Sequence, residues 1–323
     1  MCAAFLEVSH AVRAAAALAA LLVTLAPAAA EGHAKSRPIL LGVLGGRARF
    51  DRLTGQQTRV GHVIAAWGQG PVTQILAALG EMPMLGITTG GSMTPRDIAF
   101  GAGDGFLGEV NRAAAAHAGP VFIRPLPEMN GHWNPYCAYN SNGSSRGPAY
   151  STQMFRKAFA RIYVLVHGGS VDVVDAALRR LGLPPSRAGD LSTDPPAHVQ
   201  VMWNPQGYGS PDLPGNSAAA YYPGDAYVDV VADDIYNIHG RYAWAANEQL
   251  YAAHPGRPYA IAEWANWGLD DPAFVARIAQ FARTHSRVEL LAYYNGRPGS
   301  PFDIASQPRS RAAYRQLIDP LGD

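Results

Sequence analysis

The sequence predicts an α/β protein built as a (β/α)8 or TIM barrel, and three observations support this fold class. From residue 38 onward, short β-branched or aromatic runs alternate with amphipathic helical stretches, which is the order that a parallel sheet with crossover helices requires. Eight such runs can be counted, whereas an open doubly wound sheet usually has fewer strands. No shift in composition marks an internal boundary, so we expect one domain over residues 31–323.

The predicted strands are short, apolar and separated by turn signals. In chain order they are Ile39–Gly42, Val60–Trp67, Pro83–Thr88, Pro120–Leu126, Val199–Trp203, Val228–Tyr236, Pro258–Glu263 and Val288–Tyr294. Helices are expected over Ser151–His167, from Pro71 and from Asp271, where helix-starting residues precede apolar residues at helical spacing. The Pro-rich stretch Leu183–Pro196 is expected to be a long connection within the domain.

The first thirty residues predict a signal peptide. An apolar run, Ala14–Leu25, precedes small residues that end at Ala30, and the run is too short to cross a bilayer. We therefore expect a secreted protein that is cleaved near Ala30. Cys2 would be removed with the peptide, which leaves Cys137 without a disulfide partner and predicts an inert, buried thiol.

The charge composition argues against some classes of partner. Lys and Arg together number 26, Asp and Glu number 25, and no block of like charges occurs. Nucleic acid and anionic membrane surfaces are therefore not expected as partners. The histidines lack a close-spaced metal-binding pattern such as H-E-x-x-H, so we expect neither a metal nor another cofactor, and we expect a monomer.

Two glutamates follow predicted strands at the end of the barrel where TIM-barrel active sites lie. Glu128 follows the fourth strand, and Glu263 ends the seventh. These strands are near enough across the barrel mouth for the two side chains to flank one bond. Glycoside hydrolysis needs such a pair, because one carboxyl group protonates the leaving oxygen while the other attacks the anomeric carbon. In a retaining enzyme the two groups should lie roughly 5 to 5.5 Å apart.

The two roles require opposite protonation states. Arg124 lies four residues before Glu128 and shares its inward face if the strand stays regular past Pro127. A guanidinium at that position would favour an ionised Glu263. Tyr236, at the end of the sixth strand, could donate a hydrogen bond to the same carboxylate.

All six tryptophans lie at or shortly after predicted strand ends. Flat sugar faces stack on aromatic rings, so this placement is typical of a cleft for a polysaccharide. The tryptophans are Trp67, Trp133, Trp203, Trp244, Trp264 and Trp267. From the strand ends we expect substrate contacts by Arg124, Asn130, Trp133, Trp203, Tyr236, Trp267 and Tyr293.

Four segments carry a family resemblance. They are Arg-Pro-Leu-Pro-Glu-Met-Asn-Gly-His-Trp from residue 124, Tyr-Pro-Gly-Asp from residue 222 with Tyr-Val-Asp from 227, Asp-Ile-Tyr-Asn from 234, and Ile-Ala-Glu from 261. Together they resemble glycoside hydrolase family 26, a clan A family whose best-known members are endo-β-1,4-mannanases. The likeness runs from about residue 39 to the C-terminus. It implies acid/base work by Glu128, nucleophilic attack by Glu263, and substrate contacts by Trp133 and Tyr236.

Two positions depart from the family pattern. Pro127 stands where members usually have the His that precedes the acid/base glutamate, and Tyr293 and Tyr294 stand where a Trp platform is usual. Both changes fall around the glycon side of the cleaved bond. The resemblance therefore implies an endo-β-mannanase first, with a mixed-linkage β-glucanase or a β-xylanase as alternatives, and exo action stays open. The missing His also leaves a non-catalytic carbohydrate-binding barrel as an alternative.

One other motif matches a different enzyme class as a string. Gly143-Ser144-Ser145-Arg146-Gly147 reads as G-x-S-x-G, the nucleophile elbow of α/β-hydrolases. An elbow needs a buried strand directly before it, but the preceding residues 140–142 are Asn-Ser-Asn. We therefore interpret this segment as a polar loop. The glycines after the first strand lack the G-x-G-x-x-G spacing of a dinucleotide site.

Overall fold

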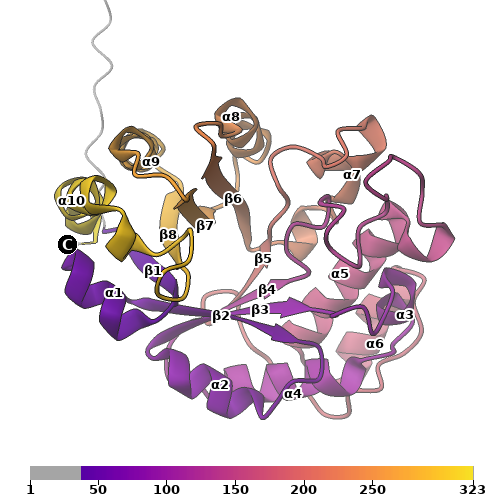
Figure 1. Cartoon of the computed structure of the whole chain (residues 1–323). Helices are drawn as coiled ribbons and strands as arrows, with labels where there is room; N and C mark the ends of the chain where they lie inside the picture. Colours follow the sequence, from indigo (N-terminus) through magenta and orange to yellow (C-terminus); the bar gives the residue numbers. More distant parts are fainter. Residues whose placement is uncertain (1–37, 323) are drawn as a thin grey trace, which may run out of the picture. The chain divides into compact units, whose positions relative to one another are not determined.

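Eight parallel strands close into a barrel that helices surround (Figure 1). The computed structural model describes residues 38–322. The strands are β1 Leu40–Gly45, β2 Val60–Ala66, β3 Met82–Thr88, β4 Val121–Pro125, β5 Val199–Trp203, β6 Val230–Ile238, β7 Tyr259–Trp267 and β8 Val288–Asn295. Each strand pairs with its neighbours in chain order and β8 pairs with β1, so the predicted (β/α)8 fold is confirmed.

The helices follow the strands in chain order. They are α1 Arg47–Thr54, α2 Val72–Leu79, α3 Pro95–Ala99, α4 Asp104–Ala115, α5 Thr152–His167, α6 Val171–Arg180, α7 Ala218–Tyr221, α8 Trp244–Ala253, α9 Pro272–Thr284 and α10 Pro308–Leu317. Short 3-10 helices lie at Pro148–Tyr150, Pro214–Asn216, Asp225–Tyr227, Ile304–Ser306 and Asp319–Leu321.

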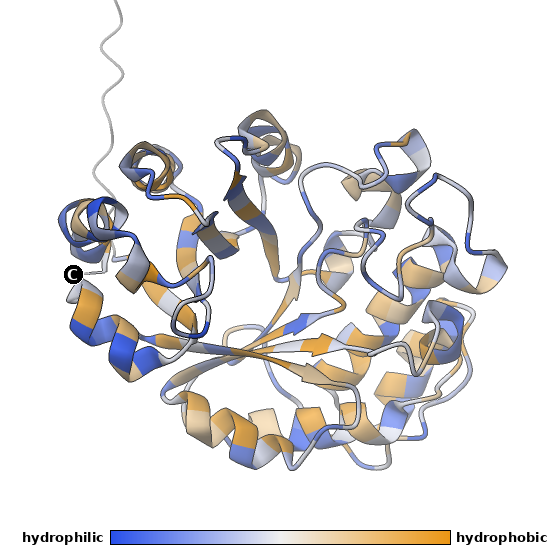
Figure 2. Cartoon of the chain, in the orientation of Figure 1, coloured by the Kyte–Doolittle hydropathy of each residue, from blue (hydrophilic) through white to orange (hydrophobic). Residues whose placement is uncertain are grey.

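Alternating strand residues build two separate apolar cores, because successive side chains of a strand point to opposite faces. The core inside the barrel consists of strand residues alone and contains Val60, Met84, Phe122, Met202, Val230, Ala232, Ala260, Ala262, Leu290 and Ala292. The larger core lies between the strands and the helices. Figure 2 shows the consequence, with largely hydrophobic strands inside a ring of helices whose surfaces are partly hydrophilic.

The expected helices form where their end signals lie. Ser151 accepts a hydrogen bond from the backbone N of Met154 at 3.3 Å and so caps α5. Asp271 caps α9 by accepting from the backbone N of Ala273 at 3.0 Å. Pro71 directly precedes α2. The expected connection over residues 183–196 contains neither helix nor strand.

The strand ends differ from expectation chiefly near the mouth of the barrel. β5 has the predicted bounds, whereas β7 continues four residues beyond Glu263, to Trp267. These residues stay paired with the end of β6, where Ile238 lies opposite Trp267. β1 likewise extends to Gly45, opposite Asn295 of β8. Local apolar runs therefore underestimate strands that end in polar cleft residues.

The predicted signal peptide, residues 1–30, lies outside the described residues. Within residues 38–322, no helix combines the length and apolar character that crossing a membrane requires. Cys137 is buried and free, as expected, with its Sγ 3.6 Å from Asn216 Oδ1.

Candidate active site

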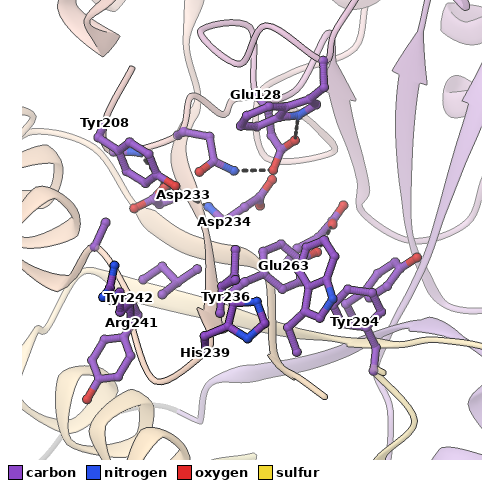
Figure 3. A pocket seen from close by; sticks show the side chains of 18 of the residues that line it. Glu128, Tyr208, Asp233, Asp234, Tyr236, His239, Arg241, Tyr242, Glu263 and Tyr294 are labelled. Atoms are coloured by element: carbon purple, nitrogen blue, oxygen red, sulfur yellow. Dashed lines mark hydrogen bonds between the residues drawn. The ribbon is translucent and has the colours of Figure 1, made fainter. Parts of the chain in front are cut away.

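A cleft of about 1190 Å³ opens at the carboxyl ends of the strands (Figure 3). This volume exceeds that of a typical pocket for a drug-sized molecule and suits several linked units. The cleft is lined by Ile64, Glu128, Trp133, Gln206, Gly207, Tyr208, Asp233, Asp234, Ile235, Tyr236, Ile238, His239, Arg241, Tyr242, Ala243, Glu263, Trp267, Tyr294 and Phe302. The structure therefore brings the two predicted catalytic glutamates into one cavity.

Glu128 reaches the cleft through a turn and not along a strand. β4 ends at Pro125, and Leu126 and Glu128 both have left-handed backbone conformations, with φ of 49° and 51°. The expectation that the strand stays regular past Pro127 is therefore wrong. Residues other than glycine rarely adopt this conformation, and those that do cluster at functional sites. The backbone N of Glu128 donates to Asn204 O at 2.7 Å, which fixes the turn to the end of β5.

Two donors from different loops hold the Glu128 carboxyl group. Trp133 Nε1 donates to Oε2 at 2.7 Å, and Gln206 Nε2 donates to Oε1. Gly131 makes the first contact possible, because a Cβ at this position would lie 2.4 Å from the Trp133 indole. The spacing of the Glu-Met-Asn-Gly-x-Trp segment thus has a steric reason.

A bulge in β7 directs Glu263 into the cleft. Ala260 and Ala262 face the barrel interior, so regular alternation would turn Glu263 outward. The pairing with β6 shifts at this point, because Asp233 lies opposite Ile261 whereas Asp234 lies opposite Glu263. One extra residue reverses the faces of all that follow, and bulges often redirect side chains next to active sites.

Arg124 lies buried beneath Glu263, where the inward alternation of β4 places it. Its guanidinium donates to Glu263 Oε1 through one terminal nitrogen and to Asp234 Oδ2 through the other. Its Nε donates to Asn204 Oδ1 at 2.7 Å. Tyr236 OH donates to Glu263 Oε2 at 2.5 Å, so the expected contacts of Arg124 and Tyr236 with Glu263 are both present.

The electrostatic environment distinguishes the two glutamates. Burial and the nearby charge of Glu263 raise the pKa of Glu128 above its ordinary value. A carboxyl group with a raised pKa keeps its proton at higher pH and can act as an acid. Glu263 is instead oriented by a guanidinium and a phenol group. Burial acts to lower the pKa of Arg124, but the carboxylates of Asp234 and Glu263 together act more strongly in the opposite direction. The pKa of Arg124 therefore lies above its ordinary value.

Exposed apolar side chains concentrate at the cleft. Nine large hydrophobic residues are exposed in the described part of the chain, and six of them line the cavity, so most of this exposed apolar surface serves one site. They are Ile64, Trp133, Tyr208, Ile238, Tyr242 and Trp267. Trp133 and Trp267 are 49% and 44% exposed, as expected of stacking platforms.

The other four tryptophans pack into the protein and do not line the cleft. They are Trp67, Trp203, Trp244 and Trp264. Trp203, which we expected to contact substrate, is fully buried because it shares the outer face of β5 with Val199 and Val201. Its ring packs against Tyr222, with centroids 4.8 Å apart.

Two further expected substrate contacts are corrected. Tyr293 is 1% exposed and packs towards the helices, and its neighbour Tyr294 lines the cleft instead. Asn130 is completely buried and holds the loop after β5. Its Nδ2 donates to Gln206 O at 2.8 Å and to Tyr208 O at 3.1 Å. Asn130 therefore supports the site from behind.

The sequence reasoning missed the loop after β5 and one carboxyl group on β6. Gln206 and Tyr208 follow Asn204 directly after a predicted strand end, which is the signal that could have identified them. Asp233 and Asp234 directly precede Ile235 and Tyr236 at the end of a predicted strand, which is the same signal. Asp234 pairs with Arg124, and Asp233 lines the cleft without being part of that ion pair.

The competing motif has no structural support. Residues 143–147 lie in a loop in which Ser145 forms an isolated bridge with Tyr139, and no buried strand directly precedes Ser145 and no α-helix directly follows it. Among the described residues, no group of three His, Cys, Asp or Glu side chains is placed to hold a metal ion.

Comparisons with known proteins agree with this architecture. No family model matches the chain. Endoglucanase H of Acetivibrio thermocellus is 24% identical over 239 residues, a match that covers 69% of this chain and 23% of that protein. This chain thus spans about a quarter of the length of that relative.

Solved structures resemble the whole barrel. A Bacillus subtilis mannanase superposes with a TM-score of 0.58 at 16% identity, covering 88% of this chain and 86% of that one. A glycoside hydrolase family 26 protein of Muricauda sp. gives a TM-score of 0.55 at 17% identity, covering 87% and 89%. A β-mannanase of Bacteroides ovatus gives 0.53 at 16% identity, covering 89% and 90%. The resemblance to glycoside hydrolase family 26 is thereby confirmed in the fold, because this chain shares the (β/α)8 barrel of these proteins.

Proposed function

We propose that this protein is a retaining glycoside hydrolase that cleaves β-1,4-linked polysaccharide, with Glu128 as acid/base and Glu263 as nucleophile. The observation that carries the proposal is the pair of carboxyl groups in one cleft, one with a raised pKa and the other held by Arg124 and Tyr236. This is the division of roles that double displacement requires.

The reaction follows from these positions. The Glu263 carboxylate attacks the anomeric carbon, the glycosidic C–O bond breaks, and Glu128 gives its proton to the leaving oxygen. Glu128, now ionised, then takes a proton from water, whose oxygen attacks the same carbon and releases Glu263. Trp133 and Gln206 hold the Glu128 carboxyl group through both steps.

We propose β-mannan as the first substrate, because solved structures with this fold include several mannanases. The similarity to an endoglucanase supports mixed-linkage β-glucan as the second candidate. β-Xylan is the third. The three polymers differ in whether the 2-hydroxyl is axial or equatorial and in whether C6 is present.

The test is a reducing-sugar assay of the purified mature protein on these three polymers. We expect release from at least one, and abolished release from the Glu263→Ala variant with oligosaccharide binding kept within about tenfold. Proton NMR of the first product should show the β-anomer, because two inversions restore the configuration. Initial α-anomer would contradict retention, and tight binding without release from any polymer would favour a non-catalytic binding barrel, the alternative that Pro127 motivates.

We also propose that the mature chain acts outside the cell as a monomer. The predicted signal peptide and a polymeric substrate support secretion. Light scattering of the secreted protein would measure its mass, and a stable dimer would contradict the second part.

A further inference from the structure

The cleft has two ends that can be told apart from Glu128 and Glu263. The chain segment 206–208 connects Glu128 to one end, because Gln206 Nε2 donates to Glu128 while Gly207 N donates to Asp233 Oδ1 at 2.9 Å. Figure 3 shows Tyr208 and Asp233 at this end and Tyr294 at the opposite end, beyond Glu263. The acid protonates the oxygen of the leaving sugar, so the end next to Glu128 is the leaving-group side.

Asp233 is an unusual group for a cleft wall. It is 2% exposed, and its Oδ1 accepts two backbone hydrogen bonds, from Gly207 N and from Asp234 N, both at 2.9 Å. Within residues 38–322 it forms no ion pair with a Lys, Arg or His side chain. Burying a carboxyl group without a cation is costly, and burial with the nearby Glu128 raises its pKa to about 7. An asparagine would accept the same two backbone bonds without this cost, so holding the loop does not explain the carboxyl group.

The surroundings of Asp233 suit a sugar ring. Tyr208 lies beside it at the same end of the cleft and is 43% exposed. Burial, Asp233 and Glu128 together raise the pKa of Tyr208, in agreement with a position near both carboxyl groups. An exposed ring next to a polar group is the combination that binds a sugar, because the ring packs on the C–H face while the polar group bonds a hydroxyl.

We propose that Asp233 and Tyr208 form a subsite for the sugar on the leaving-group side of the cleaved bond, with the Asp233 carboxyl group binding a sugar hydroxyl and the Tyr208 ring packing on the sugar face. The proposal rests on the proposed hydrolase function for its direction. It makes Asp233 a specificity-determining residue beyond Glu128 and Glu263. A glycan acceptor that reacts with the glycosyl enzyme would occupy the same place.

The kinetic test compares two substrates that present different groups on the leaving-group side. β-1,4-Mannohexaose places sugars on both sides of the cleaved bond, whereas 4-nitrophenyl β-mannobioside presents an aryl group there. Asp233→Asn should lower kcat/KM for the hexasaccharide about tenfold or more, because the variant lacks the second carboxyl oxygen that would bind the sugar hydroxyl. For the aryl glycoside we expect a change of less than about twofold. Cellohexaose and the cellobioside serve as the second pair.

A purely structural role predicts a different result. If Asp233 only held the 206–208 segment, Asp233→Asn would keep both backbone hydrogen bonds and change neither rate, and any displacement of Gln206 from Glu128 would reduce turnover of both substrates equally. Equal losses, or an unchanged hexasaccharide rate, would overturn the proposal. Asp270→Asn is the matched control, because Asp270 also accepts two backbone hydrogen bonds, from Arg309 N at 3.0 Å and Ser310 N at 2.7 Å, outside the cleft. Tyr208→Ala should reproduce the substrate pattern of Asp233→Asn.

Calorimetry separates this proposal from the hydrolase function itself. In the Glu263→Ala background, adding Asp233→Asn should raise the Kd for mannohexaose or cellohexaose about tenfold. Such an increase would support the subsite even if the wild type hydrolysed nothing, in which case only the proposed function would fail. An unchanged Kd, or no binding of either hexasaccharide, would overturn the subsite.

Discussion

Replacing Arg124 with methionine should destabilise the protein by about 4 kcal/mol at neutral pH. Arg124 is 1% exposed and pairs with both Glu263 and Asp234. Without the guanidinium, folding would bury two carboxyl groups with no cation, so one of them would have to take up a proton. With an ordinary pKa near 4, this costs about 1.4 kcal/mol per pH unit, or about 4 kcal/mol at pH 7. Removing one partner of a buried ion pair typically costs about 3–5 kcal/mol.

Urea unfolding at two pH values would measure this effect. At pH 5 the loss should shrink to roughly 1.4 kcal/mol, because a carboxyl group binds a proton more readily in acid. Arg161→Met is the matched control, since Arg161 forms an equally buried pair with Asp104 at 2.6 Å, away from the cleft. The control should lose stability but keep its hydrolytic rate per folded molecule, whereas Arg124→Met should lose both. A loss below about 1 kcal/mol at both pH values for Arg124→Met would refute the reasoning.

Three further predictions concern single side chains. Glu263→Gln should lower the pKa of Glu128, because the charge of Glu263 contributes to raising it. The fluorescence of Trp133, whose indole donates to Glu128, should then titrate at lower pH than in the wild type. An unchanged midpoint would contradict the coupling between the two glutamates. Gly131→Ala should reduce kcat at least about tenfold with little change in KM, because its Cβ would displace Trp133 from Glu128, the proposed acid. Gly105→Ala, whose Cβ would meet nothing within 4 Å, should leave kcat unchanged. Asp233 has a pKa raised to about 7, so the folded protein holds a proton that the unfolded chain has lost between about pH 4 and pH 7. The free energy of unfolding of the wild type should therefore fall by up to about 4 kcal/mol as pH rises through this window, and that of Asp233→Asn should not. Urea unfolding would measure both free energies. If they changed with pH in parallel, the proton would not be held on Asp233.

The parts of the site that depend on residue type and strand order could be predicted from the sequence. Glu128 and Glu263 follow the fourth and seventh strands, and parallel strands deliver their carboxyl ends to one face of a barrel. Arg124 could be assigned to the interior because it lies within a regular strand. The alternation that placed Arg124 also predicts an outward Trp203, which shares its face with Val201. That error came from weighing aromatic character above strand periodicity.

The parts that depend on irregular backbone could not be predicted. Alternation from Ala260 assigns Glu263 to the outer face, and only the bulge in β7 reverses this assignment. The same reversal turns Trp264 towards the helices, where it stacks on Tyr314 with centroids 5.6 Å apart. The left-handed turn at Glu128 contains no glycine that would have indicated it in the sequence. Both irregularities depend on tertiary contacts, which a reading of local propensity does not contain.

The seclusion of Arg124 at the bottom of the cleft also determines how the site responds to its medium. Mobile ions screen charges that water reaches, over about 8 to 10 Å at moderate ionic strength, but they screen a guanidinium that is 1% exposed much less. The attraction between Arg124 and Glu263 should therefore change little with the salinity of the surroundings.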